Sequence, residues 1–196
     1  LEKGRIEDIP FTRVQTIQYN QTEDRIFIGT RDEGLFSLTA DPDNNSYSVS
    51  KIGSDLELGS LDVQDVYEGN DLNLWISAGG EGIYRLLYDD QNEKYSSSTL
   101  YNEQNGLNSN YIRDIFEDIE GNLWFGSYGE GLFVLKEQAF SFFEPNVESF
   151  DNSILDIIKV DDNYWLSSET GILITDFSEN KKLVIDNRNG LPVDAV

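Results

Sequence analysis

The chain has 196 residues, with 14 Lys and Arg against 37 Asp and Glu, which gives a formal net charge of −23 at pH 7. It contains no His, Cys or Met, so disulfides, thiolate nucleophiles, the usual zinc sites, Ser-His-Asp catalysis and a histidine phosphoacceptor are excluded. An acidic surface repels phosphate groups, and no apolar stretch is long enough to span a bilayer. We therefore expect no nucleic-acid partner, no direct membrane insertion, no cofactor and no metal.

Four related segments predict the strands of the chain in order. Residues 27–35, 75–83, 124–132 and 165–172 each begin with an aromatic residue and reach a glycine that an aliphatic residue follows. The aromatic positions are Phe27, Trp75, Trp124 and Trp165, and the glycine positions are Gly34, Gly82, Gly131 and Gly171. The glycines are 48, 49 and 40 residues apart, which agrees with the period of roughly 40–50 residues in four-stranded propeller blades.

Each repeat predicts four strands. The first strand carries two aliphatic residues separated by two other residues, and these pairs are Val14/Ile17, Val63/Val66, Ile112/Ile115 and Ile154/Ile157. A polar turn leads to the aromatic strand, a third β-rich run follows the glycine, and a weaker fourth strand such as 140–143 closes the unit. No helical periodicity competes with this pattern. Because a sandwich or a barrel would not need one spacing at a fixed period, we predict an all-β fold of about four four-stranded antiparallel propeller blades.

The repeats place residues 1–196 in a single partial β-propeller domain. The approximate blades are residues 12–60, 61–110, 111–152 and 153–188, and residues 189–196 are predicted to begin a fifth. The chain is therefore expected to be a fragment of a larger propeller. A closed four-bladed propeller remains the alternative, because both lie within the usual range of blade counts.

The third repeat has a recognisable sequence. Residues 111–132 read YIRDIFEDIEGNLWFGSYGEGL, and the preceding residues 105–110 read NGLNSN. This segment closely resembles the two-component regulator propeller repeat, and residues 105–110 resemble the connector between blades of that family. The connector recurs at residues 189–196, and the resemblance is weakest in the first repeat, where Phe27 stands in place of the Trp.

This resemblance implies a place in a larger signalling protein. The family forms the sensor portion of hybrid two-component system histidine kinases of the Bacteroidetes type, with seven-bladed propellers followed by further domains and a kinase. It implies a periplasmic or extracellular location, and as partners the remaining blades, the downstream signalling domains, an oligosaccharide ligand and a possible homodimer. Any kinase activity would lie elsewhere in the parent protein, because this chain has no histidine to phosphorylate.

Three aspartates hold one position in the first strand of their repeats. They are Asp65, Asp114 and Asp156, while Thr16 holds this position in the first repeat. Alternation along a strand sends these side chains to one common face, although a bulge would change which face that is. On one interpretation they line a central channel and bind a cation or a polar ligand, with Arg113 as a further candidate for ligand binding. On the other they form a solvated channel wall or accept backbone N–H bonds.

The loops after the second strands give another candidate surface. Loops on a rigid scaffold are where binding residues concentrate, and these loops carry Tyr128, Glu81 and Glu130. Each of these residues also suits an ordinary solvated turn. The repeated aromatic residues are instead interpreted as core that fills the space between blades, and the repeated glycines as turns or close backbone approaches.

These observations favour a non-catalytic, ligand-sensing propeller segment that recognises an extracellular glycan or another small polar ligand. An enzyme is the first alternative, because paired carboxylates could serve a propeller glycosidase or lyase. A protein-interaction scaffold is the second. No isolated, non-repeating pair of carboxylates stands out, so we expect no catalytic residues in this chain.

Overall fold

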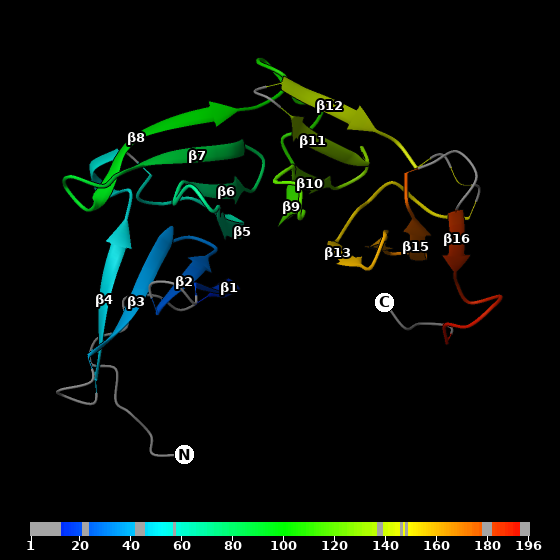
Figure 1. The fold of residues 1–196 in the computed structure, drawn as a ribbon, viewed down its shortest axis with the longest axis horizontal. Coiled ribbons are helices and arrows are strands. Elements are labelled where there is room, and N and C mark those ends of the chain that lie inside the picture. The colour runs from blue at the N-terminus through cyan, green and yellow to red at the C-terminus, as the bar shows by residue number, and fades with distance from the viewer. Residues whose placement is uncertain are drawn as a thin grey trace. The chain divides into compact units, whose positions relative to one another are not determined.

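The computed structural model describes residues 13–20, 24–41, 46–56, 58–136, 139–145, 147, 149–177 and 182–192. These residues form sixteen strands and one short 3-10 helix, η1 (Ser54–Leu56). The all-β prediction is therefore confirmed (Figure 1). Residues 193–196, which belong to the predicted start of a fifth blade, lie outside the described residues.

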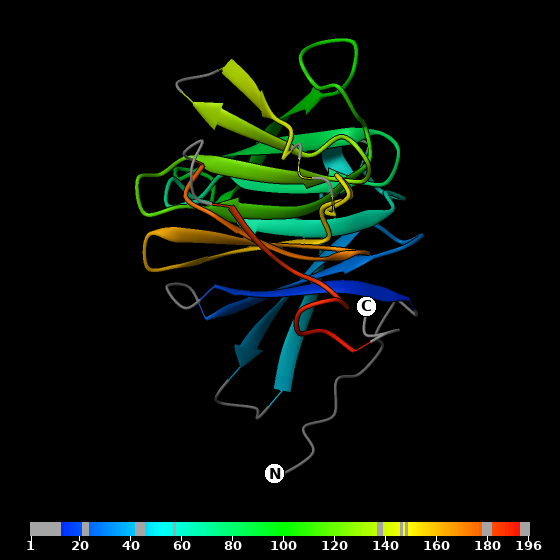
Figure 2. The same cartoon turned by 90° about the vertical axis from the view of Figure 1, so that its right-hand side faces the viewer.

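The strands form four sheets, each of four strands in chain order. The first sheet contains β1 (Val14–Asn20), β2 (Arg25–Thr30), β3 (Leu35–Asp41) and β4 (Ser46–Ile52), and the second contains β5 (Val63–Glu68), β6 (Leu74–Ala78), β7 (Gly82–Asp89) and β8 (Lys94–Tyr101). The third contains β9 (Ile112–Glu117), β10 (Leu123–Ser127), β11 (Leu132–Lys136) and β12 (Ala139–Phe143). The fourth contains β13 (Asp156–Val160), β14 (Asn163–Ser168), β15 (Gly171–Thr175) and β16 (Lys182–Ile185). Figures 1 and 2 show the strands of each sheet running alternately in opposite directions, as predicted for propeller blades.

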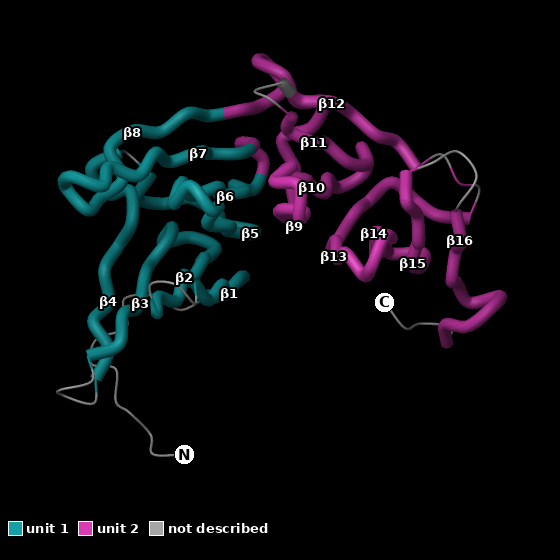
Figure 3. The backbone as a smooth tube through the Cα atoms, viewed as in Figure 1, with its two compact units in different colours: residues 1–79, 83–100 teal, residues 80–82, 101–196 magenta. Residues whose placement is uncertain are grey.

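The chain divides into two compact units (Figure 3). Unit 1 comprises residues 1–79 and 83–100, and unit 2 comprises residues 80–82 and 101–196. The first two sheets lie almost wholly in unit 1, and the third and fourth sheets lie in unit 2. The blade limits and the domain organisation derived from the repeats stay a prediction.

The core of unit 1 lies between the first and second sheets. Phe27 and Leu35 of the first sheet pack in one cluster with Val63, Leu74 and Ile76 of the second, and all five are almost fully buried. Full burial of an aliphatic or aromatic side chain stabilises the fold by about 1.5–3 kcal/mol relative to leaving it exposed. The inner strands of unit 1 are buried in continuous runs, as in β6, where all five residues are buried.

The core of unit 2 is richer in aromatic rings. Trp124 stacks on Phe177 with centroids 4.5 Å apart and 7° between the planes, and Tyr164 lies 5.1 Å from Trp124. Phe143 meets Phe177 edge to face at 4.7 Å. Trp124 is buried, as are Phe27 and Trp75 in unit 1, whereas Trp165 is half-buried. Three of the four repeated aromatic residues are thus buried within a unit, as expected for residues interpreted as core.

In the second, third and fourth repeats the repeated glycine lies close to the end of the fourth strand. A Cβ on Gly82 would lie 2.1 Å from the carbonyl oxygen of Tyr101, and one on Gly131 would lie 2.7 Å from that of Phe143. Both residues also have positive φ, of 117° and 76°. A larger residue at either position would have to adopt a disfavoured backbone conformation and displace the neighbouring strand. Gly34 and Gly171 share the positive φ.

The turn between β9 and β10 is organised by Asp118, which is buried. Its carboxylate accepts the backbone N–H of Glu120 at 3.0 Å and that of Asn122 at 2.9 Å. It also accepts the indole N–H of Trp124 at 2.8 Å and the hydroxyl of Tyr164 at 2.9 Å. Because Tyr164 belongs to β14, this one side chain joins the third sheet to the fourth.

Candidate functional site

The loops after the second strands are held by a repeated hydroxyl group. Thr30 and Ser127 each donate a hydrogen bond to the carbonyl oxygen of the repeated glycine, at 2.6 and 2.9 Å. The same hydroxyls accept the backbone N–H of Glu33 and Glu130, both at 3.1 Å. Ser168 stands at the equivalent position of the fourth repeat and accepts the N–H two residues on, at 3.2 Å. These loops are therefore fixed in shape, which suits them to present side chains for binding.

The sequence analysis did not single out these hydroxyl residues. They occupy one position in three of the four repeats, and Ala78 holds that position in the second. A recurring hydroxyl just before a turn is the signal that could have found them, because such residues hydrogen-bond to nearby backbone groups.

Two exposed tyrosines and an arginine gather on unit 2 beside the Ser127 loop. The backbone N–H of Tyr128 donates to the carbonyl oxygen of Tyr111 at 2.8 Å. The guanidinium carbon of Arg113 lies 5.5 Å from the centre of the Tyr128 ring. Tyr111 and Tyr128 are 59% and 46% exposed, so both residues present surface to the solvent. We call these three residues the tyrosine surface.

Two of the predicted carboxylates, Glu81 and Glu130, lie on segments next to the tyrosine surface. Glu130 is exposed and lies two residues from Tyr128 on the same loop. Glu81 is exposed in the segment 80–82, and the Cβ position of its neighbour Gly80 lies 3.5 Å from the Tyr111 ring. The structure thus brings Tyr128 and Arg113 into direct contact and places Glu81 and Glu130 on adjoining segments. Tyr111 is a member that sequence reasoning missed, although it opens the third repeat.

The aspartates of the first strands bridge neighbouring sheets within each unit. Asp65 accepts a hydrogen bond of 2.9 Å from the hydroxyl of Thr16. Asp114 accepts the backbone N–H of Ile157 at 2.8 Å. Asp156 is exposed at the start of β13. Asp114 therefore accepts a backbone N–H, which is one of the alternatives that the sequence left open, whereas Asp65 accepts a side-chain hydroxyl.

A β-bulge decides where Arg113 points. The register of β9 against β10 pairs Gly126 with Asp114 and Ser127 with Ile112, so Arg113 is the extra residue. The first two sheets have a shift at the same place, at Gln15 and Gln64. A bulge bends the strand and re-aims the side chain of the extra residue. Arg113 can therefore reach Tyr128, while Asp114 next to it reaches the fourth sheet.

The described residues hold no group of three or more Asp, Glu, His or Cys side chains that could bind a metal ion. Hydrogen bonds lower the pKa of the carboxylates Asp118 and Asp186. Although burial acts in the opposite direction, hydrogen bonds from Trp124, Asn122 and Tyr164 lower the pKa of Asp118 to about 2. Hydrogen bonds from Arg188 likewise lower the pKa of Asp186.

Within the part of the chain that the structure describes, no helix is long and apolar enough to cross a membrane.

Comparison with known families identifies the third repeat. Residues 106–129 match the family described as two component regulator propeller. The resemblance predicted from the sequence is thereby confirmed. The matched segment contains all three residues of the tyrosine surface, Tyr111, Arg113 and Tyr128. No curated protein matches the chain.

Solved structures confirm the propeller fold. The extracellular domains of the putative hybrid two component systems BT3049 and BT4673 from B. thetaiotaomicron are 22% and 18% identical to this chain, with TM-scores of 0.72 and 0.68. The matches cover 92% and 93% of this chain and 24% and 26% of those chains. This chain therefore spans about a quarter of the length of these structures.

Propeller enzymes share the same fold. A catalytically inactive virginiamycin B lyase from Staphylococcus aureus is 12% identical, with a TM-score of 0.64, over 98% of this chain and 60% of the lyase. At identities this low the likeness shows the fold and does not transfer an activity in either direction.

Proposed function

We propose that this chain, whose third repeat is a two component regulator propeller repeat, is a ligand-sensing, non-catalytic segment of a bacterial two-component receptor. The observation that carries this proposal is the position of the tyrosine surface inside the matched repeat. Exposed aromatic rings beside an arginine and carboxylates suit a polar ligand with apolar faces, such as a glycan, because the rings stack and the charged groups hydrogen-bond to hydroxyls. The segment would lie in the periplasm or outside the cell.

The carboxylate chemistry supports a sensor more than a glycosidase or lyase. A general acid in such an enzyme needs a raised pKa. Asp118 and Asp186 have lowered pKa values instead. Asp114, one of the three aspartates that recur in the first strands, accepts a backbone N–H of the fourth sheet. Turnover of an oligosaccharide that disappears in Asp114→Asn would favour the enzyme over the sensor.

The partners follow from the same proposal. Further propeller blades and the signalling domains of the parent chain would carry the binding event to a kinase. A homodimer would bring two such propellers together in the receptor. A pure interaction scaffold is the rival function, and it predicts that no small ligand binds.

Calorimetric titration of the full-length protein with an oligosaccharide panel tests the proposal. We expect Tyr128→Ala and Arg113→Gln each to weaken binding about tenfold, because each removes a contact of the order of 1 kcal/mol with the ligand. Tyr47→Ala is the matched control, since Tyr47 is 43% exposed on β4 of unit 1, and it should leave binding unchanged. Equal losses in all three variants would contradict a site at the tyrosine surface, and no binding by the wild type would contradict the sensor proposal.

A further inference from the structure

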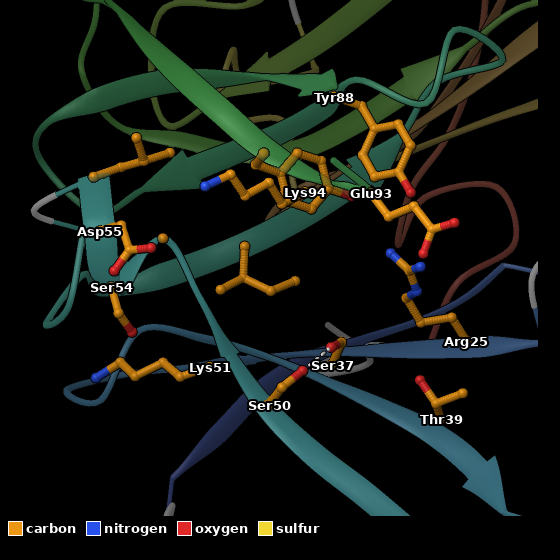
Figure 4. A pocket seen from close by; sticks show the side chains of 14 residues that line it. Arg25, Ser37, Thr39, Ser50, Lys51, Ser54, Asp55, Tyr88, Glu93 and Lys94 are labelled. Carbon is orange, nitrogen blue, oxygen red and sulfur yellow. Dashed lines mark hydrogen bonds between the residues drawn. The ribbon is translucent and has the colours of Figure 1, made fainter. Parts of the chain in front are cut away.

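Unit 1 contains a pocket of about 370 Å³ whose lining includes no residue of the tyrosine surface (Figure 4). Strands β2, β3 and β4 of the first sheet form one side, and the β7–β8 hairpin of the second sheet forms the other. The turn at Gly53 and the helix η1 close one end. Sites for small ligands commonly have volumes of about 300–1,000 Å³, so a molecule of one or two rings would fit here.

A small polar residue lies at the base of the pocket. The third residue after the repeated glycine is Ser37 in the first repeat, Arg85 in the second, Val134 in the third and Ile174 in the fourth, so this position is polar in unit 1 and apolar in unit 2. In unit 2 the aromatic rings of Trp124, Phe143 and Phe177 fill the space between the outer strands. Ser37 is too small to fill it and is buried at 7% exposure. The Ser37 hydroxyl is hydrogen-bonded to that of Ser50, and the two hydroxyls together keep further donor and acceptor capacity.

Hydroxyl groups form the floor of the pocket. The Oγ atoms of Ser37 and Ser50 are hydrogen-bonded at 2.8 Å across β3 and β4. Thr39 lies two residues further along β3 and is exposed. Figure 4 shows these three side chains on the same side of the pocket. Each hydroxyl can both donate and accept, which suits a ligand that carries hydroxyls of its own.

Charges of both signs line the pocket. Figure 4 shows Arg25 and Glu93 pointing toward one another at one end, and Lys94 and Asp55 are also lining residues. The side chain of Lys51 lies on the opposite face of the sheet, where its ammonium group is 5.5 Å from the Phe36 ring. The side chains that face the pocket therefore balance in charge.

Two tyrosine rings complete the lining. Tyr88 and Tyr95 meet edge to face with centroids 5.5 Å apart. The hydroxyl of Tyr95 donates to Glu68 at 2.9 Å, which fixes its ring. Rings held in this way offer a flat apolar surface beside the polar floor.

We infer that this pocket binds a neutral sugar of one or two rings. Sugar hydroxyls match the serine and threonine floor and the paired charges, and the tyrosine rings match the apolar face of the sugar. The net charge of −23 repels anionic ligands, so a neutral sugar is favoured over an acidic one. The choice of a sugar as the ligand rests on the proposed sensor function. The inference adds to that function a binding site in unit 1.

The test uses the full-length protein with maltose, cellobiose, lactose and glucuronate as probes. Calorimetry measures affinity, and hydrogen–deuterium exchange locates binding by protection of residues 46–56 and 88–95. Ser37→Val copies Val134 of the third repeat and removes the central hydroxyl, and Glu93→Gln removes one charge from an exposed turn. Lys51→Gln is the matched control, since it removes a charge next to Ser50 on the opposite face.

We expect a neutral disaccharide to protect residues 46–56 and 88–95, and we expect Ser37→Val and Glu93→Gln to weaken its binding at least about tenfold while Lys51→Gln does not. If Ser37→Val fails to fold, the effect of Glu93→Gln on affinity tests whether the pocket binds the sugar. Protection confined to residues 111–130, with binding lost only in Tyr128→Ala, would overturn the pocket and leave the sensor proposal standing. Tighter binding of glucuronate in the pocket would overturn the choice of a neutral sugar, and no binding of any probe would overturn both proposals.

Discussion

The carboxylate of Asp118 shows how one residue holds two sheets of unit 2 together. It accepts hydrogen bonds from the β9–β10 turn, from the ring of Trp124 and from the hydroxyl of Tyr164 on β14. Burial alone would raise its pKa, so these hydrogen bonds must outweigh the cost of burying a charge, and they lower the pKa to about 2. The ionised form of Asp118 therefore stabilises the folded chain.

The stability contributed by Asp118 should depend on pH. The ordinary pKa of 3.8 falls to about 2 in the folded chain, so the contribution is complete above pH 3.8 and is lost as the pH falls through 2. A shift of this size corresponds to about 2 kcal/mol. Denaturant unfolding should find Asp118→Asn about 2 kcal/mol less stable than the wild type at pH 7, with the gap closing toward pH 2. A gap that does not change with pH would show that the carboxylate charge is irrelevant.

At the scale of the elements, a hydroxyl group holds the loop after the second strand in the first and third sheets. Thr30 and Ser127 use one hydroxyl to donate to the repeated glycine and to accept the following loop N–H. The glycine in turn passes so close to the fourth strand that a Cβ has no room at Gly131. The loop, the turn and the end of the fourth strand are therefore coupled within a sheet.

Replacing the hydroxyl of Thr30 tests this coupling. Thr30 is fully buried, so Thr30→Val keeps the shape but leaves the carbonyl of Gly34 and the N–H of Glu33 without this partner. We expect a loss of about 1–3 kcal/mol in the free energy of unfolding. Thr30→Ser is the matched control, because it retains the hydroxyl and removes one methyl group, and should cost about 1 kcal/mol. If thermal unfolding ranks the serine variant below the valine variant, packing and not hydrogen bonding fixes the loop.

At the scale of the whole molecule, the charge of −23 is the dominant electrostatic feature. The described ion pairs are few and mostly exposed, as in the 3.2 Å pair of Arg13 with Asp32 and the 3.4 Å pair of Arg85 with Asp71. Exposed pairs of this kind contribute little. Repulsion among the unpaired carboxylates should therefore oppose folding.

Salt should stabilise the chain for this reason. The Debye length falls from about 30 Å at 0.01 M to about 8 Å at 0.15 M ionic strength, which screens repulsion between distant carboxylates. We expect the melting temperature at pH 7 to rise by about 2–4 °C when NaCl increases from 10 to 150 mM, which corresponds to roughly 1 kcal/mol for a chain of this size. A fall in the melting temperature would mean that attractive pairs outweigh the repulsion.

Much of the architecture was predictable because short, repeated sequence patterns specify the strands and turns. The spacing from Trp124 to Gly131 and its recurrence predicted four-stranded sheets, and the sheets follow chain order as expected. Tyr128 and Arg113 were both named from the third repeat, and the structure brings them into contact. Tyr111 and Ser37 were missed, since a tyrosine before a strand and a serine within one are ordinary when read alone.

The sequence by itself determined the all-β class, the number of strands in a repeat and the family that the third repeat resembles. Strand patterns and turn residues act between residues that are close in the chain, so they can be recognised without the tertiary structure. Only the tertiary structure decided what the side chains do. The bulge at Arg113 separated its direction from that of Asp114, and Ser37 became the floor of a pocket only when the second sheet supplied Glu93 and Tyr95. The direction of a side chain and the lining of a pocket depend on which side chains from distant strands pack against one another. Tertiary packing determines these contacts, and the local sequence pattern does not.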